Sequence, residues 1–401
     1  MLTTAEALQA VLANSPEFEA ESIPVSELTG RVLKQSILAE RDQPPFDRVM
    51  MDGIAIAFSD YENGQREFPI QATQSAGDKV FSLEPGKCIE IMTGSPRPEN
   101  ADTIVPVERI TVANGTATLE DGYAAKAGRH IHPRGSDYSK DDELLRPGAR
   151  ISSLDIAIIT SCGYTEVDVA KDPVVRIIST GNELVPAGQP IEDHQIRMSN
   201  GPAIESLLRD HGYRRCAQDH LVDEIDTLRK ALAAHLDAAD VLILSGGVSM
   251  GKADYVPQVL ADLGVKVVFH KVSQRPGKPM WFGTGPQGQR VFALPGNPVS
   301  ALVCCRQYVV PSLIRASGIK STPPEFAALA SNVSFKPDLT CFQPVRLTSN
   351  TAGQVLAIPV KTNTSGDFAS LSGTQGYVEL PKEQTHFDAG TSVFLHRWIA
   401  T

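Results

Sequence analysis

Five polar stretches between residues 179 and 300 carry side chains that could act on a phosphorylated substrate. The acids Glu183, Asp223 and Asp254 stand in three of them, and the cations Arg275 and Lys278 stand in a fourth. Carboxylates beside cationic side chains can hold a metal ion and an oxyanion together. The stretches are STGNEL (179–184), HLVDE (220–224), SGGVSMGKAD (245–254), SQRPGKP (273–279) and LPGNPVS (294–300).

The third stretch is a near match to a nucleotide-triphosphate loop. Gly246, Gly251 and Lys252 fit the first seven positions of G-x-x-x-x-G-K-[ST], but Ala253 replaces the hydroxyl that should hold magnesium. A triphosphatase is therefore not favoured, and the lack of G-x-G-x-x-G disfavours a dinucleotide dehydrogenase. The stretch still predicts a phosphate cradle, made of Gly246, Gly247, Ser249 and Gly251.

Asp254 places a carboxylate directly beside this predicted phosphate cradle. A phosphate near the glycines would be repelled by this carboxylate unless a divalent cation lay between them, and carboxylates plus phosphate oxygens are the usual magnesium shell. Asp223 and Asp254 are therefore the predicted metal ligands. The alternative is that each only caps the helix that begins beside it, which is a common role for aspartate.

The fourth and fifth stretches predict a corner that holds an oxyanion. LPGNPVS opens a helix whose free N-terminal amides favour an anion, and Ser300 offers a hydroxyl nearby. Together with Arg275 and Lys278, this corner would hold a tetrahedral oxyanion close to the phosphate cradle. The alternative for SQRPGKP is a solvated surface turn.

The elements between residues 173 and 318 must bring these stretches together. Apolar, β-branched strands alternate with helices there, which predicts a doubly wound sheet with helices on both faces. Ligands of such folds bind at the carboxyl ends of the strands, where the polar stretches fall. The predicted strands are 174–180, 216–222, 240–245, 265–272 and 291–295, and the predicted helices are 201–212, 223–236, 254–264 and 297–318.

The rest of the chain predicts three further regions. Helical spacing at 4–12, 26–38 and 151–163 indicates packing helices, whereas short β-rich runs divided by turns fill 46–131 and the tail. The fold class is thus multidomain α/β plus β. We expect a helical connecting domain at 1–45 and 132–172, an inserted β domain at 46–131, the sheet domain at 173–318 and a C-terminal β-barrel-like domain at 319–401.

Composition limits the partners. A formal charge of −10 argues against an affinity of the whole protein for nucleic acid or acidic membranes. The chain shows no leader-like start and no apolar run of the roughly 20 residues that cross a bilayer. Six cysteines without C-x-x-C spacing fit reduced core cysteines rather than a zinc knuckle or a disulfide framework. We therefore expect a cytoplasmic protein.

Together with SN (199–200), MMDGIAI (50–56) and IMTGSPRP (91–98), the polar stretches resemble the molybdopterin molybdenumtransferases of the MoeA type. The resemblance runs over essentially the full chain. It implies a four-domain homodimer that takes adenylylated molybdopterin, cleaves the pyrophosphate link with Mg²⁺, releases AMP and transfers molybdate to the dithiolene. It also implies contacts with a molybdopterin adenylyltransferase and with recipient molybdoenzymes.

The resemblance assigns roles residue by residue. Asp223 and Asp254 match the acids linked to magnesium, and Glu183 matches a functional acid. Asp52 and Thr93 match functional positions on the β insert, which in the family reaches over the partner's sheet domain. The molybdate corner corresponds to Arg275, Lys278, Ser300 and the loop-shaping Pro295 and Pro298, with Arg346 and Ser370 as further anion contacts.

Five positions depart from the family pattern. Val49 replaces a hydroxyl side chain and Ile54 an aromatic one. His132 stands for an arginine, Asn182 for an aspartate and Arg275 for a lysine. These changes bear on fine substrate contacts more than on the reaction, because the acids and the anion-binding charges are present.

Two rival functions remain open from the sequence. A molybdopterin adenylyltransferase would share the fold of 173–318, although the flanking β regions argue against it. A non-catalytic dimeric scaffold of the same fold is the second, and the presence of Asp223, Asp254 and Lys278 favours an enzyme. The sequence does not decide whether water or molybdate attacks phosphorus, nor whether molybdenum or tungsten is delivered.

Overall fold

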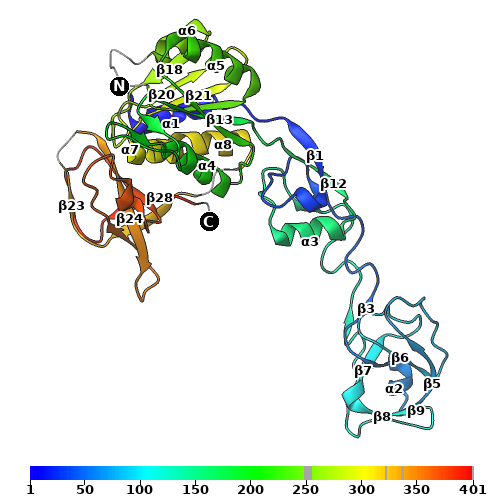
Figure 1. Cartoon of the computed structure of the whole chain (residues 1–401). Coiled ribbons are helices and arrows are strands. Elements are labelled where there is room, and N and C mark those ends of the chain that lie inside the picture. Colours follow the sequence, from blue (N-terminus) through cyan, green and yellow to red (C-terminus); the bar gives the residue numbers. More distant parts are fainter. Residues whose placement is uncertain (248–254, 321–322, 336–337, 400–401) are drawn as a thin grey trace. The chain divides into compact units, whose positions relative to one another are not determined.

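The structure is a computed structural model that describes residues 1–247, 255–320, 323–335 and 338–399. The chain forms two compact units (Figure 1). The sheet unit comprises Met1–Lys34, Pro147–Ser152 and Val167–Thr401. The inserted unit comprises Gln35–Arg146 and Ser153–Glu166. Within the described ranges, no helix is both long and apolar enough to cross a membrane.

A six-stranded sheet is the centre of the sheet unit, and it confirms the predicted α/β class. Four neighbouring strands are parallel, and β20 runs antiparallel to both of its neighbours. In spatial order the strands are β16 (Cys216–Leu221), β13 (Val175–Thr180), β17 (Val241–Ser245), β21 (Arg290–Leu294), β20 (Trp281–Thr284) and β18 (Lys266–His270).

The antiparallel strand β20 was not predicted. Only five residues separate β20 from β21, and the Gly285 amide donates to the Gln289 carbonyl at 2.8 Å across that turn. So short a connection can join only antiparallel strands, because a parallel crossover needs a dozen or more residues. The sheet is therefore mixed rather than wholly parallel, while the edge that carries the polar stretches keeps its parallel strands.

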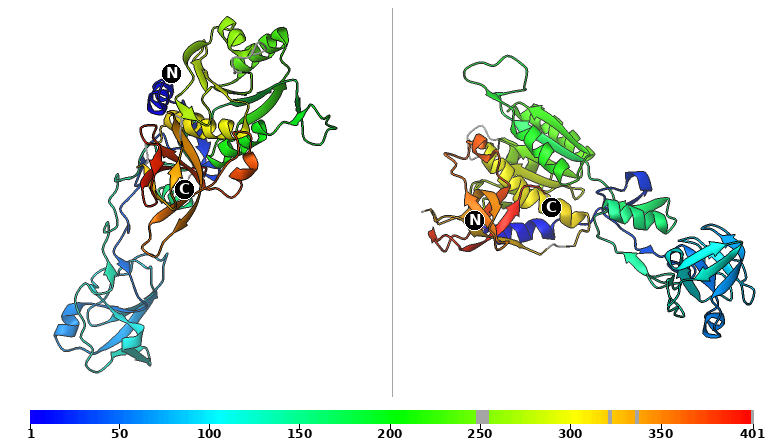
Figure 2. Two further views of the ribbon diagram at one scale, coloured as in Figure 1. Left: turned by 90° about the vertical axis from the view of Figure 1, so that its left-hand side faces the viewer. Right: turned by 90° about the horizontal axis from the view of Figure 1, so that it is seen from below.

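Helices cover both faces of this sheet, as the two views in Figure 2 show. Apolar side chains of α1 (Thr4–Ala13), α4 (Asn200–Asp210), α7 (Pro298–Cys304) and α8 (Val310–Ala316) form one core with the sheet. Those of α5 (Ile225–Ala238) and α6 (Val256–Asp262) form the core on the other face.

The helix predicted at 297–318 is interrupted. A π-helical turn, η3 (Cys305–Val309), separates α7 from α8. Pro311 lies two residues beyond the end of this turn, and its missing N–H cannot complete the usual i to i−4 ladder. Both cysteines of the ALVCC sequence are buried in this region, and burial raises the pKa of the Cys304 thiol to about 12. These thiols are therefore core side chains rather than nucleophiles.

The tail folds into a closed five-stranded barrel, which confirms the barrel-like prediction. Each strand pairs with the next, and β26 pairs back with β24 to close the ring. Around the ring the strands are β24 (Thr340–Ser349), β25 (Val355–Pro359), β22 (Glu325–Leu329), β28 (Ser392–Arg397) and β26 (Gly376–Leu380). The short β19 (Gln274–Arg275) adds to β24 in parallel, so the RPGKP loop is attached to the barrel.

A second six-stranded sheet forms the inserted unit. Its spatial order is β7 (Thr103–Pro106), β4 (Gly53–Ile56), β6 (Cys88–Ile91), β5 (Glu67–Gln74), β9 (Thr116–Leu119) and β8 (Ile110–Ala113). This unit also holds α2 (Phe58–Glu62), the 3₁₀ turn η2 (Val107–Arg109) and α3 (Ser153–Ser161), which is the helix predicted at 151–163.

Five short two-stranded pairs complete the described structure. They are β1 (Ala20–Pro24) with β12 (Glu166–Ala170), β2 (Ile37–Leu38) with β11 (Glu143–Leu145), β3 (Arg48–Val49) with β10 (Ile131–His132), β14 (Leu184–Val185) with β15 (Ile196–Arg197), and β23 (Val333–Ser334) with β27 (His386–Phe387). Two 3₁₀ turns, η1 (Val25–Glu27) and η4 (Phe368–Leu371), lie in the sheet unit.

The prediction of a helix at 26–38 is wrong. Only η1 forms, and Gly30 then adopts a left-handed backbone with φ of +80°. From there the backbone pairs with another segment: the Leu33 amide donates to the Ala149 carbonyl and the Lys34 amide to the Asp168 carbonyl, each at 2.9 Å. Tertiary pairing with strand-like partners thus overrides a helical spacing of apolar residues.

Gly53 is held in a place that no side chain can share. Its φ is +152°, and a Cβ there would lie 2.0 Å from the Val105 carbonyl oxygen on β7. We expect Gly53→Ala to destabilise the inserted unit by about 2–3 kcal/mol, because β4 and β7 would have to separate. Hydrogen exchange of the β4 and β7 amides measures this loss.

A matched control separates steric clash from backbone strain. Gly115 also has a positive φ, +76°, but nothing lies within 4 Å of its added Cβ. Gly115→Ala should therefore cost only about 1 kcal/mol. Equal exchange rates for the two variants would contradict the close approach of β4 and β7.

Candidate active site

The carboxyl ends of the parallel strands surround a cavity of about 780 Å³, which we call the first cavity. Loops after β13, β16, β17 and β21 contribute to its wall. This is the edge where open α/β sheets bind ligands. The predicted site residues that line it are Glu183, Asp223, Gly246, Gly247, Pro295 and Pro298.

Asp223 is fixed by its neighbour loop. Its amide donates to Asn182 Oδ1 at 3.1 Å, so the side chain that departs from the family pattern connects the loops after β13 and β16. His220 Nε2 donates to the Gly181 carbonyl at 2.8 Å and makes a second connection between the same loops. These bonds place Asp223 and Glu183 on the wall of one cavity.

The two glycines after β17 come close to β13. A Cβ on Gly246 would lie 2.5 Å from the Thr180 carbonyl oxygen, and one on Gly247 would lie 2.8 Å from the Thr180 hydroxyl. Their φ angles of +101° and +65° also suit glycine. The close approach of this loop to β13 therefore leaves no room for a side chain at either position.

Two residues of this wall were not among the predicted site residues. Thr180, at the end of β13, is 4% exposed, and its hydroxyl has no hydrogen-bond partner within the described ranges. Asn200, at the start of α4, donates through Nδ2 to Ser245 Oγ at 2.8 Å and to the Gly296 carbonyl at 2.7 Å. Both lie in quoted motifs, STGNEL and SN, but sequence alone gave no contact for them.

The cationic corner lines a second cavity of about 650 Å³. Arg275, Lys278 and Ser300 contribute to it, together with Lys361, a cation that sequence reasoning missed. The two cavities share Pro279, Pro295 and Asn297 in their walls, so they adjoin.

The predicted acids that the structure describes and the predicted cations thus line two adjoining cavities. The loop 273–279 passes between the sheet and the barrel, because β19 pairs with β24 at Gln274 and Arg275. Barrel residues such as Phe342 and Gln343 therefore form the other wall of the cationic cavity. The acids line the first cavity and the cations line the second, and Pro279 and Pro295 lie in the walls of both.

Some predicted site residues lie elsewhere. Arg346 is exposed on β24, and Ser370 donates to the Asp367 carbonyl at 2.6 Å within the η4 turn. Neither lines the two cavities, although Phe368 of the same turn lines the first. The predicted Ser249, Gly251 and Asp254 lie outside the described residues. Within the ranges described, no three His, Cys, Asp or Glu side chains gather as a metal site.

Asp52 and Thr93 meet in the inserted unit. Thr93 donates to Asp52 Oδ1 twice, from its hydroxyl at 2.7 Å and from its amide at 2.6 Å. Because both bonds favour the charged form, they lower the pKa of the Asp52 carboxyl. This exposed carboxylate is therefore ionised and held in one orientation.

Comparison with known proteins decides the family. The chain is 38% identical to the molybdopterin molybdenumtransferase of Synechocystis over 99% of this chain and 100% of the relative. The chain belongs to the molybdopterin molybdenumtransferase family. A Haemophilus influenzae molybdopterin molybdenumtransferase is 31% identical over 98% of each chain.

Family descriptions and a solved structure agree with this assignment. The MoeA N-terminal region (domain I and II) matches residues 2–163, a probable molybdopterin binding domain 176–315, and the MoeA C-terminal region (domain IV) 327–398. The molybdopterin biosynthesis MoeA protein from Pyrococcus horikosii is 28% identical, with a TM-score of 0.85 over all of both chains.

Three departures from the pattern of the molybdopterin molybdenumtransferases are explained by packing. Val49 and Ile54 are 1% and 0% exposed and belong to the two cores of the inserted unit. His132 lies between Arg48, whose Nη2 is 3.1 Å from its Nδ1, and Asp137, whose Oδ1 is 3.1 Å from its Nε2. In this chain the three side chains take part in the packing and polar contacts of the inserted unit.

Proposed function

We propose that this chain inserts molybdate into adenylylated molybdopterin and releases AMP. The observation that carries the proposal is the pair of adjoining cavities: one joins carboxylates to a glycine cradle, and the other gathers cations. A pyrophosphate-linked substrate fits the first, and an oxyanion fits the second. The bond that breaks is the phosphoric anhydride, with AMP as the leaving group and water or molybdate supplying the attacking oxygen.

The donor set of the first cavity fits a magnesium ion. Asp223 and Glu183 offer hard carboxylate oxygens beside the Gly246–Gly247 backbone, and Asp254 is the further carboxylate that the sequence supplies. When bound, Mg²⁺ would neutralise charge on the pyrophosphate. We propose Asp223 and Asp254 as its ligands.

The chain's own groups bind and orient the substrate. Asn182 holds the loop that carries Asp223, and the glycine loop after β17 is proposed to offer backbone N–H groups to phosphate oxygens. The Thr180 hydroxyl, which has no partner among the described residues, can donate to the same group. His220 already donates Nε2–H to a backbone carbonyl, so it acts as a structural connection rather than as a general base.

Molybdate is proposed to occupy the second cavity on Arg275, Lys278 and Ser300. Lys278→Gln removes one charge-assisted contact, worth about 1.5–3 kcal/mol, so the apparent KM for molybdate should rise by roughly 10- to 100-fold. AMP release without molybdate should change little, because the first cavity is untouched. Lys266→Gln, an exposed site on β18, is the control. An unchanged KM for molybdate in Lys278→Gln would show that molybdate does not bind in this cavity.

The experiment that tests the function is incubation with adenylylated molybdopterin, with and without molybdate and Mg²⁺. AMP release that depends on Mg²⁺, with molybdenum bound to the dithiolene product, is expected. Adenylylation of molybdopterin by ATP would instead identify an adenylyltransferase. Binding of the substrate without turnover would identify a scaffold.

We also propose a cytoplasmic homodimer. Asp52 and Thr93 belong to the inserted unit, whereas residues of the sheet unit line both cavities, and the resemblance implies that the inserted unit reaches over the partner's sheet domain. Six free cysteines suit a reducing compartment. We also propose contacts with a molybdopterin adenylyltransferase, which would deliver the substrate, and with recipient molybdoenzymes, which would receive the product.

A further inference from the structure

An enclosed guanidinium stands at the amino ends of the central strands. Arg290 begins β21, and the residue is 4% exposed. Its Nη2 donates to the Pro16 carbonyl at 3.2 Å, while Nε and Nη1 have no hydrogen-bond partner within the described chain. Buried guanidinium donors are nearly always paired, so two bare N–H groups call for a ligand.

Arg290 lines a cavity of about 470 Å³, which we call the third cavity. The segment 17–19, residues 171–174, the end of α5 and the turn between β20 and β21 form its wall. It lies at the opposite ends of the strands from the first cavity, about 13 Å away along β21. It is therefore a separate site from the proposed reaction centre.

The charge of Arg290 is poorly compensated by its surroundings. Among the described residues Arg290 has no carboxylate within ion-pair distance, although the acids Glu17, Glu19, Asp237 and Asp240 line the same cavity and the charge of Asp240 partly offsets the burial of the guanidinium. Glu17 bonds Lys34 at 2.8 Å, and Asp240 accepts the Val174 amide at 2.8 Å. Burial lowers the pKa of Arg290 to about 10, so the charged form is less stable there than in water.

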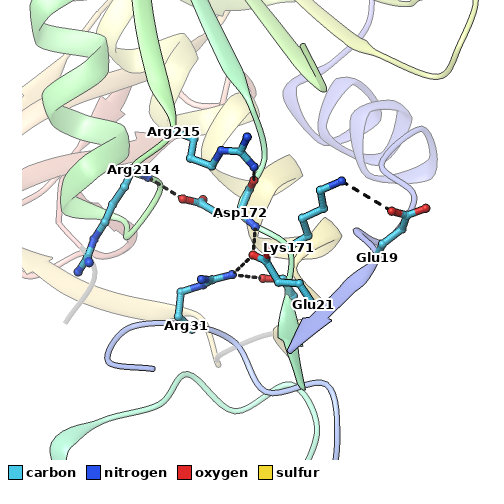
Figure 3. Close-up of polar contacts among 8 residues, drawn as sticks. Glu19, Glu21, Arg31, Lys171, Asp172, Arg214 and Arg215 are labelled. Carbon is cyan, nitrogen blue, oxygen red and sulfur yellow. Dashed lines mark hydrogen bonds and ion pairs between the residues drawn. The ribbon is translucent and has the colours of Figure 1, made fainter. Parts of the chain in front are cut away.

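Further groups around the cavity suit an anion. The Phe18 ring covers one face of the guanidinium, with Cζ 4.6 Å from the ring centroid. Lys171 and Arg215 also line this cavity and are exposed. Figure 3 shows their side chains with their partners Glu19 and Asp172. Lys171 Nζ is 3.8 Å from Glu19, and Arg215 Nη1 donates to the Asp172 carbonyl at 3.3 Å, so each has donors to spare.

We propose that the third cavity binds a small oxyanion, a carboxylate or a phosphate group, on Nε and Nη1 of Arg290, with Lys171 and Arg215 as outer contacts. A charge-assisted bond to each bare N–H satisfies donors that would otherwise remain buried without a partner. Such a ligand would also join the segment 17–19 to the sheet, because the same guanidinium already contacts Pro16 and Phe18.

The test titrates the full chain carrying Lys278→Gln, so that the second cavity loses a cation, with inorganic phosphate and separately with acetate. The arginine Nε–H resonances and the melting temperature are followed. Saturable one-to-one shifts of the Arg290 resonance are expected with at least one anion, and the stronger of the two identifies the ligand class.

Variants assign the binding to this residue. Arg290→Met should weaken binding at least tenfold, whereas Arg229→Met, an exposed site on α5, should leave it unchanged. The titration of the chain that retains Arg290 decides the matter even if Arg290→Met folds poorly. No saturable shift with either anion, or equal binding by Arg290→Met, would overturn the proposal and leave water as the partner of these donors.

Discussion

Asp223→Asn is expected to lower the rate of AMP release from adenylylated molybdopterin by at least about 100-fold. The carboxylate lines the first cavity beside Glu183 and the glycine cradle. The carboxamide keeps the shape of the side chain but removes the negative charge that would hold a divalent cation. The hydrogen bond to Asn182 Oδ1 comes from the backbone N–H of Asp223 and not from its side chain. The loop should therefore keep its position in the variant. Single-turnover AMP release at saturating Mg²⁺ measures the loss.

A nearby carboxylate provides the control. Asp226 lies three residues further along on α5, with a side chain 99% exposed and 3.2 Å from Arg229. Such a surface pair contributes little to stability, so Asp226→Asn should keep both its activity and its melting temperature. If Asp223→Asn retained more than half of the activity while the fold was intact, Asp223 would not be part of the reaction centre.

The sequence predicted the parts of the sheet unit that depend on local pattern. Strands of apolar β-branched residues bury both faces, and the polar stretches at their ends converge whatever the details of the loops. That is why Glu183, Asp223 and the two glycines, Gly246 and Gly247, were expected in one cavity and line it together.

Features that depend on long-range pairing were missed. The apolar spacing of 26–38 indicates a helix, yet its backbone is used by partners more than 110 residues away. The division of acids and cations into two cavities follows from β19 joining a barrel strand 66 residues further on. No local pattern carries such a pairing, since it depends on how the barrel closes.

Side-chain roles were the hardest to predict. Asn182 and Ile54 looked like losses of substrate contacts, but Asn182 connects two loops and Ile54 fills a core. Arg346 and Ser370 were expected at the anion, and neither is among the described residues that line the first or the second cavity. Residue type alone does not distinguish a ligand contact from packing, because both use the same side chains in different surroundings.

Mixing two inactive chains should restore activity if the homodimer is built as proposed. Asp52→Ala removes the ionised carboxylate that Thr93 orients, and Asp223→Ala removes the one on the first cavity. Each homodimer should be at least about 100-fold less active than the parent, since both carboxylates would act in every site.

In a heterodimer of these chains, one site combines the intact Asp223 of one chain with the intact Asp52 of its partner. After unfolding and refolding of an equal mixture, half of the dimers are heterodimers with one intact site of two, so about a quarter of the parent's AMP release should return. Co-refolding two copies of the same variant is the control and should give none. If Asp52 serves the sheet unit of its own chain, every site in the mixture lacks one carboxylate, and the activity stays at the level of the single variants.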